Sequence, residues 1–242
     1  MGREENIAIF KDTTTCCTQN QTLVTAIQDS LRKQYFQAEE DALNKIERNI
    51  FSKPARVVVS KKRSLEAAKA YRDQRVVVHN FASSTIPGGG VQKGSGAQEE
   101  CLCRCSTLYF CLDTPEMWGK YYNPHRVAAN PLHNDDLIYT PVVVVFKSDT
   151  ASPKLLPEAE WYKVNIITCA APNLKANPTN MFNPDDGNQA VAVSDSELLA
   201  IHEKRLRRIL DVAVINGNET VILGAFGCGA FANKVEVVAL AA

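Results

Sequence analysis

The chain alternates between segments with apolar residues at helical spacing and runs of consecutive β-branched residues. Apolar side chains recur at helical intervals over residues 6–17, and charged helix formers run over residues 37–51. These two patterns predict a helical N-terminal extension, residues 1–53, that packs on the rest of the chain. The strand-like runs are residues 56–60, 76–81, 137–146, 164–170 and 220–226.

Helical segments lie between several of these strands. They are residues 65–72, 97–112, 196–209 and 233–242, and Ser194 or Asp195 is the expected N-cap of the third. The run of four valines at 142–145 is continuously apolar, as expected when helices cover both faces of a sheet. The pattern predicts a three-layer α/β/α sandwich. Residues 123–131 and 172–188 are rich in Pro and Asn and are predicted to be loops, and no final strand is visible after residue 226.

Length and charge narrow the class of protein. With 242 residues and 45% hydrophobic content, a single α/β domain is expected. Lys plus Arg and Asp plus Glu number 27 each, so no overall positive field favours nucleic acid, and direct sequence-specific nucleic-acid binding is not expected. The charged start and an apolar run of only residues 140–146 predict a cytoplasmic protein that does not enter a membrane.

The eight cysteines form no CxxC pair. Cys101, Cys103 and Cys105 alternate along a predicted helix, and positions i, i+2 and i+4 of a helix do not converge on one ion. They are interpreted as small buried apolar residues in a reducing compartment. Because no HExxH or comparable ligand cluster is present, no metal and no cofactor are predicted.

A glycine-rich loop follows the buried strand at residues 76–81. It contains Gly88, Gly89 and Gly90, and after seven more residues a predicted helix opens with the sequence 98–100, Gln-Glu-Glu. Glycines let backbone N–H groups approach a diphosphate or a ribose, and a helix N-terminus favours anions. Acidic residues at a helix start usually only offset the helix dipole. Their position at the end of a buried strand, where α/β sheets bind ligands, makes a binding site the better interpretation here.

A second glycine loop, residues 223–231, follows the last predicted strand. It also joins a strand to a helix start and can present backbone N–H groups to phosphate. Two such loops at one edge of a sheet predict a cleft. Phe231 is either a core residue or a side chain that lies against a sugar or base.

The triple glycine, the seven-residue spacer and the Gln-Glu-Glu sequence resemble the signature of bacterial-type poly(ADP-ribose) glycohydrolases. The lead-in at residues 80–82 and the second glycine loop extend the resemblance. It implies a macrodomain-like fold with a mixed central sheet, and hydrolysis of the O-glycosidic ribose–ribose bonds of poly(ADP-ribose). Poly(ADP-ribose) or ADP-ribosylated macromolecules would be the substrate and ADP-ribose the product, and we expect a monomer.

The resemblance also implies roles for individual residues. Glu100 would be the catalytic acid and base, and Glu99 would contact ribose hydroxyls. Relatives often have asparagine where this chain has Ser83, which puts a direct ribose contact from that position in doubt. The implied substrate-binding residues are Asn80, Gly88, Gly89, Gly90, Gln98, Gly227, Cys228, Gly229, Ala230 and Phe231.

Adjacent helical residues point about 100° apart, so Glu99 and Glu100 cannot flank one bond as paired glycosidase carboxylates do. A single acid/base, Glu100, is predicted, and to donate a proton near neutral pH its pKa must rise against the helix dipole. The ligand diphosphate, the charge of Glu99 and desolvation are three candidate causes.

Two alternative functions remain, and a third is disfavoured. One is a reader that binds ADP-ribose without turnover, and the other is a hydrolase of single ADP-ribose groups on protein or nucleic acid. A Rossmann dehydrogenase is disfavoured, because no GxGxxG opens a helix after the first strand.

Overall fold

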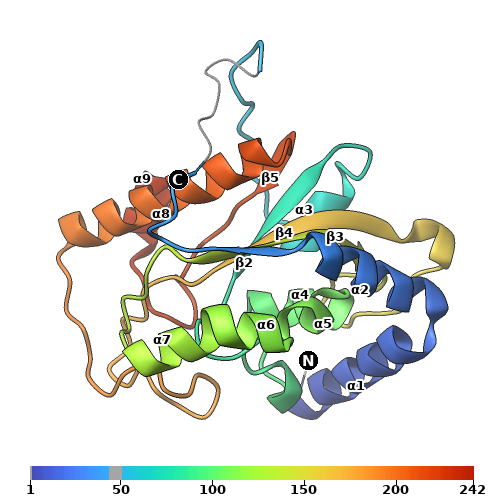
Figure 1. The fold of residues 1–242 in the computed structure, drawn as a ribbon, viewed down its shortest axis with the longest axis horizontal. Coiled ribbons are helices and arrows are strands. Elements are labelled where there is room, and N and C mark those ends of the chain that lie inside the picture. The colour runs from blue at the N-terminus through green and yellow to red at the C-terminus, as the bar shows by residue number, and fades with distance from the viewer. Residues whose placement is uncertain (1, 44–50) are drawn as a thin grey trace.

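The computed structural model describes residues 2–43 and 51–242, and its centre is a mixed sheet (Figure 1). The strand order is β1-β3-β4-β2-β5. β2 runs parallel to β4 and β5, whereas β3 is antiparallel to β1 and β4. The mixed sheet predicted from the resemblance is therefore present. The strands are β1 (Tyr35–Gln37), β2 (Val76–Phe81), β3 (Leu137–Val145), β4 (Tyr162–Cys169) and β5 (Thr220–Ile222).

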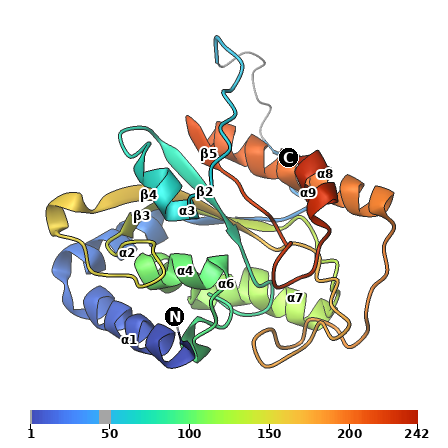
Figure 2. The ribbon, with the colours of Figure 1, turned by 180° about the vertical axis from the view of Figure 1, so that it is seen from behind.

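Helices cover both faces of the sheet, as Figures 1 and 2 show from opposite sides. The N-cap of α8 is Ser194, whose hydroxyl accepts from the Glu197 N–H while the Glu197 carboxylate accepts from the Ser194 N–H. The described α-helices are α1 (Arg3–Gln19), α2 (Gln21–Lys33), α3 (Ser64–Lys69), α4 (Gln98–Cys105), α5 (Leu108–Leu112), α6 (Pro115–Met117), α7 (Asn123–Ala128), α8 (Asp195–Ile215) and α9 (Val235–Ala241). Shorter helical turns are η1 (Val91–Lys93), η2 (Trp118–Tyr122) and η3 (Glu158–Glu160).

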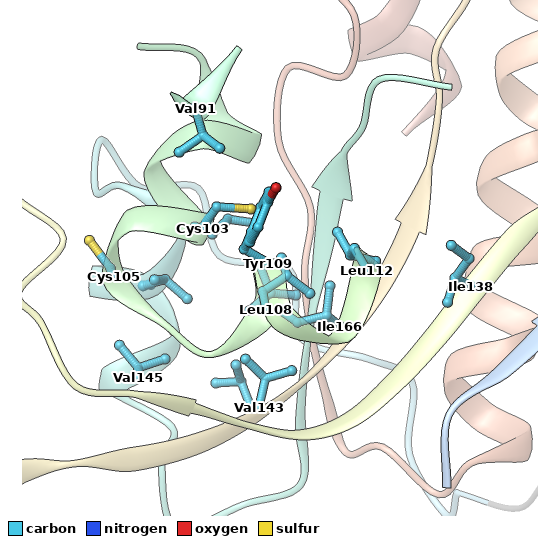
Figure 3. Close-up of a cluster of buried hydrophobic side chains, with 14 of the residues drawn as sticks. Val91, Cys103, Cys105, Leu108, Tyr109, Leu112, Ile138, Val143, Val145 and Ile166 are labelled. Carbon is cyan, nitrogen blue, oxygen red and sulfur yellow. The ribbon is translucent and has the colours of Figure 1, made fainter. Parts of the chain in front are cut away.

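Alternate residues of β2 belong to two separate cores. Val76 and Val78 pack with side chains of α3, α4 and α5, and Figure 3 shows part of this cluster. Val77 points to the other face and packs with Ile209 and Val212 of α8. Because both faces of the strand are buried, residues 76–78 are apolar without alternation. The predicted three-layer α/β/α sandwich is confirmed.

A bulge interrupts β3 between Thr140 and Val143. Thr140 pairs with Ile166 and Val143 pairs with Val164, so β3 uses three steps where β4 uses two. The extra residue reverses the alternation of side chains. Both Ile138 and Val143 therefore face the same core although an odd number of positions separates them.

The strand predicted over residues 56–60 is absent from the described structure. These residues are extended but unpaired, and Val57 and Val59 are 86% and 95% exposed. Figure 1 shows residues 51–60 projecting from the sheet. Valine favours strands because its side chain packs well against neighbouring strands. No described strand lies beside residues 56–60, so this stabilisation is absent.

The N-terminal extension is helical only in its first part. α1 and α2 occupy residues 3–33, but Tyr35–Gln37 form strand β1 beside β3, and residues 38–43 form a turn region. The helix predicted over residues 37–51 is therefore wrong at its start, and its residues 44–50 lie outside the described residues. Helix α1 packs on helix α4, since Thr13 Oγ1 donates to the Arg104 carbonyl at 2.6 Å.

Two further boundaries differ from the prediction. The helix predicted over residues 97–112 is divided at Ser106 and Thr107, because the Thr107 N–H donates to the Val144 carbonyl of β3 instead of continuing the helix. Residues 123–128, predicted as loop, form helix α7. It continues directly from the turn η2, and its proline lies in its first turn. Residues 172–188 are irregular as predicted, and β5 ends at Ile222, short of residue 226.

Candidate functional site

Two glycine loops leave the sheet at the same edge. β2 and β5 are parallel neighbours, so their carboxyl ends point to the same edge of the sheet, and Ile222 pairs with Val78. The second loop reaches the end of β2, because a Cβ built on Gly224 would lie 2.9 Å from Cζ of Phe81.

The triple glycine bends directly over the two acidic side chains of α4. Gly88 and Gly89 have φ angles of +66° and +53°, which side chains disfavour. A Cβ on Gly89 would meet Oε1 of Glu100 at 2.8 Å and Oε2 of Glu99 at 3.2 Å. A Cβ on Gly90 would meet the Phe182 ring at 2.7 Å. Close approach at each position therefore explains why the loop consists of glycine.

Glu100 keeps one carboxylate oxygen without a partner. The side chain is in the first turn of α4 and the residue is 5% exposed. Oε1 accepts from the Gly90 N–H at 2.9 Å, whereas Oε2 is buried and has no hydrogen-bond partner among residues 2–43 and 51–242. Buried polar atoms are almost always satisfied. Oε2 of Glu100 can therefore form a further hydrogen bond beside the glycine bend.

Glu99 differs because both of its oxygens are engaged. Oε2 accepts from the Ser83 N–H at 2.8 Å and Oε1 accepts from Nδ2 of Asn80 at 3.2 Å. Burial, followed by the like charge of Glu100, raises the pKa of Glu99 from 4.5 to about 8 against these hydrogen bonds. Glu99 is therefore mostly protonated at neutral pH.

The Gln98 amide fastens α4 to β2. Its Oε1 accepts from the Phe81 N–H at 2.9 Å, and its Nε2 donates to the His79 carbonyl at 2.8 Å and to Ser64 Oγ at 3.1 Å. Gln98 was predicted to contact substrate, but its amide is already bonded to the protein at both ends. Asn80, fully buried on β2, retains an unpartnered Oδ1 among the described residues.

The second glycine loop is held from behind by Asn233, a residue that sequence reasoning missed. Its Nδ2 donates to the Pro172 carbonyl at 2.6 Å, and a Cβ on Gly227 would meet the same nitrogen at 2.6 Å. Gly229 and Ala230 are exposed, and their backbone N–H groups have no backbone acceptor in the described part of the chain. The half-buried ring of Phe231 packs on the α8 core and lies 5.8 Å from the His133 ring. Half-buried Cys228 packs on the same core.

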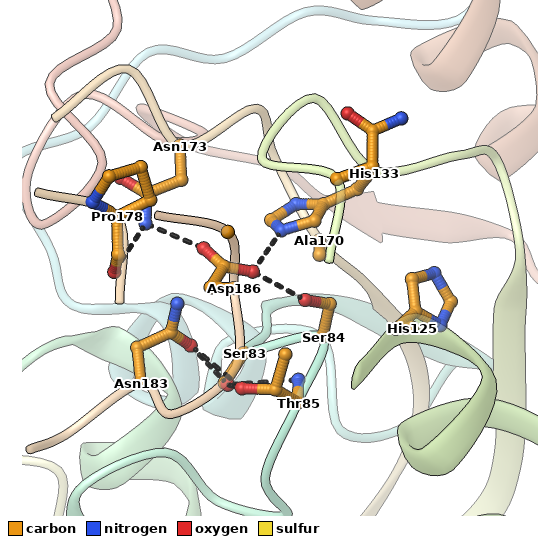
Figure 4. A network of polar contacts seen from close by, with 12 residues as sticks. Ser83, Ser84, Thr85, His125, His133, Ala170, Asn173, Pro178, Asn183 and Asp186 are labelled. Atoms are coloured by element: carbon orange, nitrogen blue, oxygen red, sulfur yellow. Dashed lines mark hydrogen bonds and ion pairs between the residues drawn. The ribbon is translucent and has the colours of Figure 1, made fainter. Parts of the chain in front are cut away.

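The loop after β4 completes this edge, and its residues were not singled out from the sequence. Ser83 Oγ donates to Asn183 Oδ1 at 2.7 Å, so Ser83 binds this loop. Asp186, 1% exposed, accepts from Ser84 Oγ at 3.1 Å and lies 2.6 Å from His133 Nε2 (Figure 4). The sequence shows that this loop is rich in Pro, Asn and Asp, but it does not show which residues these side chains contact.

Three further features bear on the predicted chemistry: the thiols, possible metal sites and possible membrane-spanning helices. All eight thiols are free. Among the described residues no group of three or more His, Cys, Asp or Glu side chains has the geometry of a metal site. No helix in that part of the chain is both long and apolar enough to cross a membrane.

A family model described as the catalytic domain of microbial-type PARG matches residues 4–148. This stretch is more than half of the chain and includes the triple glycine, Glu99 and Glu100. The chain belongs to the microbial-type PARG family. The resemblance drawn from the Gly-Gly-Gly and Gln-Glu-Glu signature is confirmed.

Solved structures agree with the family. Poly(ADP-ribose) glycohydrolase from Thermomonospora curvata, bound to the inhibitor ADP-HPD, is 28% identical with a TM-score of 0.80, covering 98% of this chain and 85% of that chain. The enzyme from Deinococcus radiodurans in complex with ADP-ribose is 35% identical with a TM-score of 0.61, covering 75% of this chain and 66% of that chain. A comparison with curated proteins finds no match.

These findings confirm the class of protein predicted from the sequence. The chain has the macrodomain-like α/β fold of these enzymes, and it is a glycosidase of the poly(ADP-ribose) glycohydrolase type. The family does not by itself assign roles to Glu99, Glu100 or the loop residues. Those roles depend on the geometry of the site.

Proposed function

We propose that the chain hydrolyses the O-glycosidic ribose–ribose bonds of poly(ADP-ribose), with Glu100 as the acid and base, and releases ADP-ribose. The observation that carries this proposal is the unpartnered Oε2 of Glu100, buried beneath the glycine bend. A carboxyl oxygen without a protein partner is available to exchange a proton with a substrate. Oε1, held by the Gly90 N–H, fixes the orientation of the group.

The reaction requires two proton transfers at Glu100. The neutral carboxyl group donates its proton to the ribose oxygen that leaves as the glycosidic bond breaks, and an oxocarbenium-like sugar forms. The resulting carboxylate then takes a proton from the water that adds to the anomeric carbon. Glu100 thereby regains its proton, and no group remains altered.

Glu99 supports this chemistry as a binding group beside the acid. With a pKa of about 8 it holds a proton at neutral pH, so the pair carries fewer than two negative charges before substrate arrives. We propose that Glu99 contacts the ribose hydroxyls, that Asn80 orients Glu99, and that the glycine bend places the ribose.

The second loop supplies phosphate contacts in this proposal. The exposed N–H groups of Gly229 and Ala230 have no backbone acceptor in the described structure, and the loop touches the β2 edge at Gly224. Backbone N–H groups of this kind bind diphosphate. The eight free thiols support a reducing compartment such as the cytoplasm. The monomeric state stays a prediction.

The test compares the wild-type chain with Glu100→Ala on automodified poly(ADP-ribose). We expect ADP-ribose release to fall by at least ~10²-fold, because the acid and base are lost, while affinity for free ADP-ribose changes little. Glu203→Ala, at an exposed position of α8, is the matched control and should keep full activity.

Two outcomes would contradict the proposal. Equal turnover by Glu100→Ala would remove this carboxyl group from the mechanism. A wild-type chain that binds polymer and releases nothing would be a reader. Parallel assays on singly ADP-ribosylated protein separate polymer hydrolysis from removal of single groups.

A further inference from the structure

A cavity of about 490 Å³ lies at the amino end of β2. Val76, the first residue of β2, lines it, whereas Phe81, the last, leads into the loop over Glu99 and Glu100. At about 3.3 Å per residue these two ends of the strand are roughly 17 Å apart. The cavity is therefore separate from the catalytic edge, on the opposite end of the sheet.

Four cationic side chains line this cavity. Lys33 ends α2, Arg72 and Arg75 follow α3, and Lys163 lies on β4. None of the four forms an ion pair within residues 2–43 and 51–242, and no carboxylate side chain is among the lining residues. Because the whole chain has a formal net charge of zero, this is a local excess of positive charge.

The surroundings of the four cations are polar and partly fixed. Arg75 Nη2 donates to the Asn216 carbonyl at 2.7 Å, which holds one guanidinium in place. The Glu219 carboxylate accepts from the Arg75 backbone N–H at 3.0 Å and forms no ion pair with the Arg75 guanidinium in the described structure. Lys33, Arg72 and Lys163 are exposed and make no side-chain hydrogen bond among the described residues. Their charges are thus available to a ligand.

A strained backbone forms one wall of the cavity. Val142, in the bulge of β3, has a φ angle of +52°, although β-branched residues strongly disfavour this region. The Val142 N–H donates to Asn165 Oδ1 at 3.0 Å, and Asn165 Nδ2 donates to Asn218 Oδ1 at 2.6 Å. Such strain persists only where the surrounding structure holds it, and it is concentrated at functional sites.

We propose that this cavity is a second phosphate-binding site, which takes a diphosphate of poly(ADP-ribose) remote from the bond that Glu100 cuts. The inference rests on the proposed function, because it needs a polymeric substrate with many diphosphates on one chain. Once one unit is held at the catalytic edge, the others are present at high effective concentration. A site of weak affinity then contributes to polymer binding without raising affinity for free ADP-ribose.

The experiment measures binding in the Glu100→Ala background, which is expected to leave the polymer intact. The cavity variant adds Lys33→Ala, Arg72→Ala and Lys163→Ala, and keeps Arg75 because it bonds to Asn216. The control variant adds Lys11→Ala, Lys53→Ala and Lys154→Ala, three exposed lysines outside the cavity with the same change in charge. Each variant is titrated with long, size-fractionated polymer and with free ADP-ribose, at low and at high salt.

We expect the cavity variant to bind long polymer about tenfold more weakly than its parent at low salt, with a shallower dependence on salt. Its affinity for free ADP-ribose should equal that of the parent, and the control variant should match the parent in both titrations. Unchanged ADP-ribose affinity also shows that the cavity variant is folded.

Equal polymer affinity in the cavity variant and its parent would overturn the inference. Titration with inorganic pyrophosphate distinguishes the source of the phosphate: if the cavity variant loses pyrophosphate binding but keeps polymer affinity, the site takes free anions and the polymer assignment is wrong. Turnover is not needed for either comparison. Failure of the proposed function, seen as a wild-type chain that leaves polymer intact, is thus recognised separately.

Discussion

Gly89 lies against the carboxyl groups of Glu99 and Glu100 and has a backbone conformation that favours glycine. Its φ of +53° disfavours any side chain, and its missing Cβ leaves the space that Glu99 and Glu100 occupy. From the sequence, this glycine was interpreted as a position that lets the backbone approach a ligand closely. The structure adds that the glycine also makes room for the acids themselves.

Gly89→Ala should therefore weaken both folding and catalysis. The new methyl group would lie 2.8 Å from Glu100 Oε1, at a strained φ, so we expect a loss of about 1–3 kcal/mol in the free energy of unfolding. Displacement of Glu100 should also lower ADP-ribose release by ~10-fold or more. Urea unfolding and a turnover assay measure the two effects. Gly119→Ala, at a position with open space and no positive φ, is the control; equal losses in both variants would contradict this account.

Because the pKa of Glu99 is raised, the free energy of unfolding should depend on pH. In the folded chain its pKa is about 8, against an ordinary value of 4.5, so between these values the folded state holds more protons than the unfolded state. The free energy of unfolding contributed by this group is complete below about pH 4.5 and is lost as pH rises through 8. Glu99→Gln removes the titration and should flatten this decline.

Chemical unfolding of the wild type and Glu99→Gln between pH 5 and pH 9 checks the prediction. The difference in unfolding free energy should move in favour of Glu99→Gln as pH rises, and it should level off above about pH 8. Asn80 can rotate to present its unpartnered Oδ1 to the new amide, which limits the cost of the substitution. Parallel pH profiles in the two proteins would show that Glu99 is ionised throughout.

The candidate residues singled out from the sequence are those that nearby positions bring together, and the residues missed are those that depend on distant contacts. Glu99, Glu100 and the triple glycine lie together because thirteen consecutive positions, residues 88–100, carry them. Asp186 and Asn233 hold the neighbouring loops through partners about 100 and 60 positions away, respectively. No local pattern encodes such pairs, and the engagement of Gln98 with the backbone of β2 was likewise not foreseen.

At the scale of elements, α4 depends on the Gln98 amide for its place beside β2. The amide satisfies the Phe81 N–H and the His79 carbonyl at the strand end. It therefore sets the position of the helix that carries Glu99 and Glu100. A side chain of the same size without these groups would leave buried backbone atoms unpaired.

Gln98→Met should lower the free energy of unfolding by about 1–3 kcal/mol, because it removes the hydrogen bonds and keeps most of the volume. Turnover should fall as α4 loses its fixed position, while Gln21→Met, at an exposed position of α2, should change neither quantity. Urea denaturation and ADP-ribose release are the measurements. Unchanged stability in Gln98→Met would mean that the amide does not fasten the helix.

Elements with strong local patterns were predicted well, and their ends were decided by tertiary contacts. β2, α1 and α8 were recognised from runs and spacing that a single element produces. The division between α4 and α5 follows from a hydrogen bond to β3, which no helix pattern contains. The valines at 57–59 have the composition of a strand but no partner in the described sheet, so their composition alone was misleading.

At the scale of the whole molecule, parallel strands bring the loops together. β4, β2 and β5 run in the same direction, so the loops that follow them gather at one edge, where the carboxyl groups lie. Continuous apolar strands were enough to predict the layers of this sandwich. The strand order β1-β3-β4-β2-β5 was not predictable, because pairing joins segments far apart in the chain.

A crystal structure of Glu100→Gln with bound ADP-ribose measures the distance on which the role of Glu100 depends. We predict that the anomeric carbon of the terminal ribose lies within about 4 Å of the side-chain amide at position 100, under the Gly89 bend, in reach of a proton transfer. A ribose bound elsewhere, with position 100 remote from the anomeric carbon, would contradict the account.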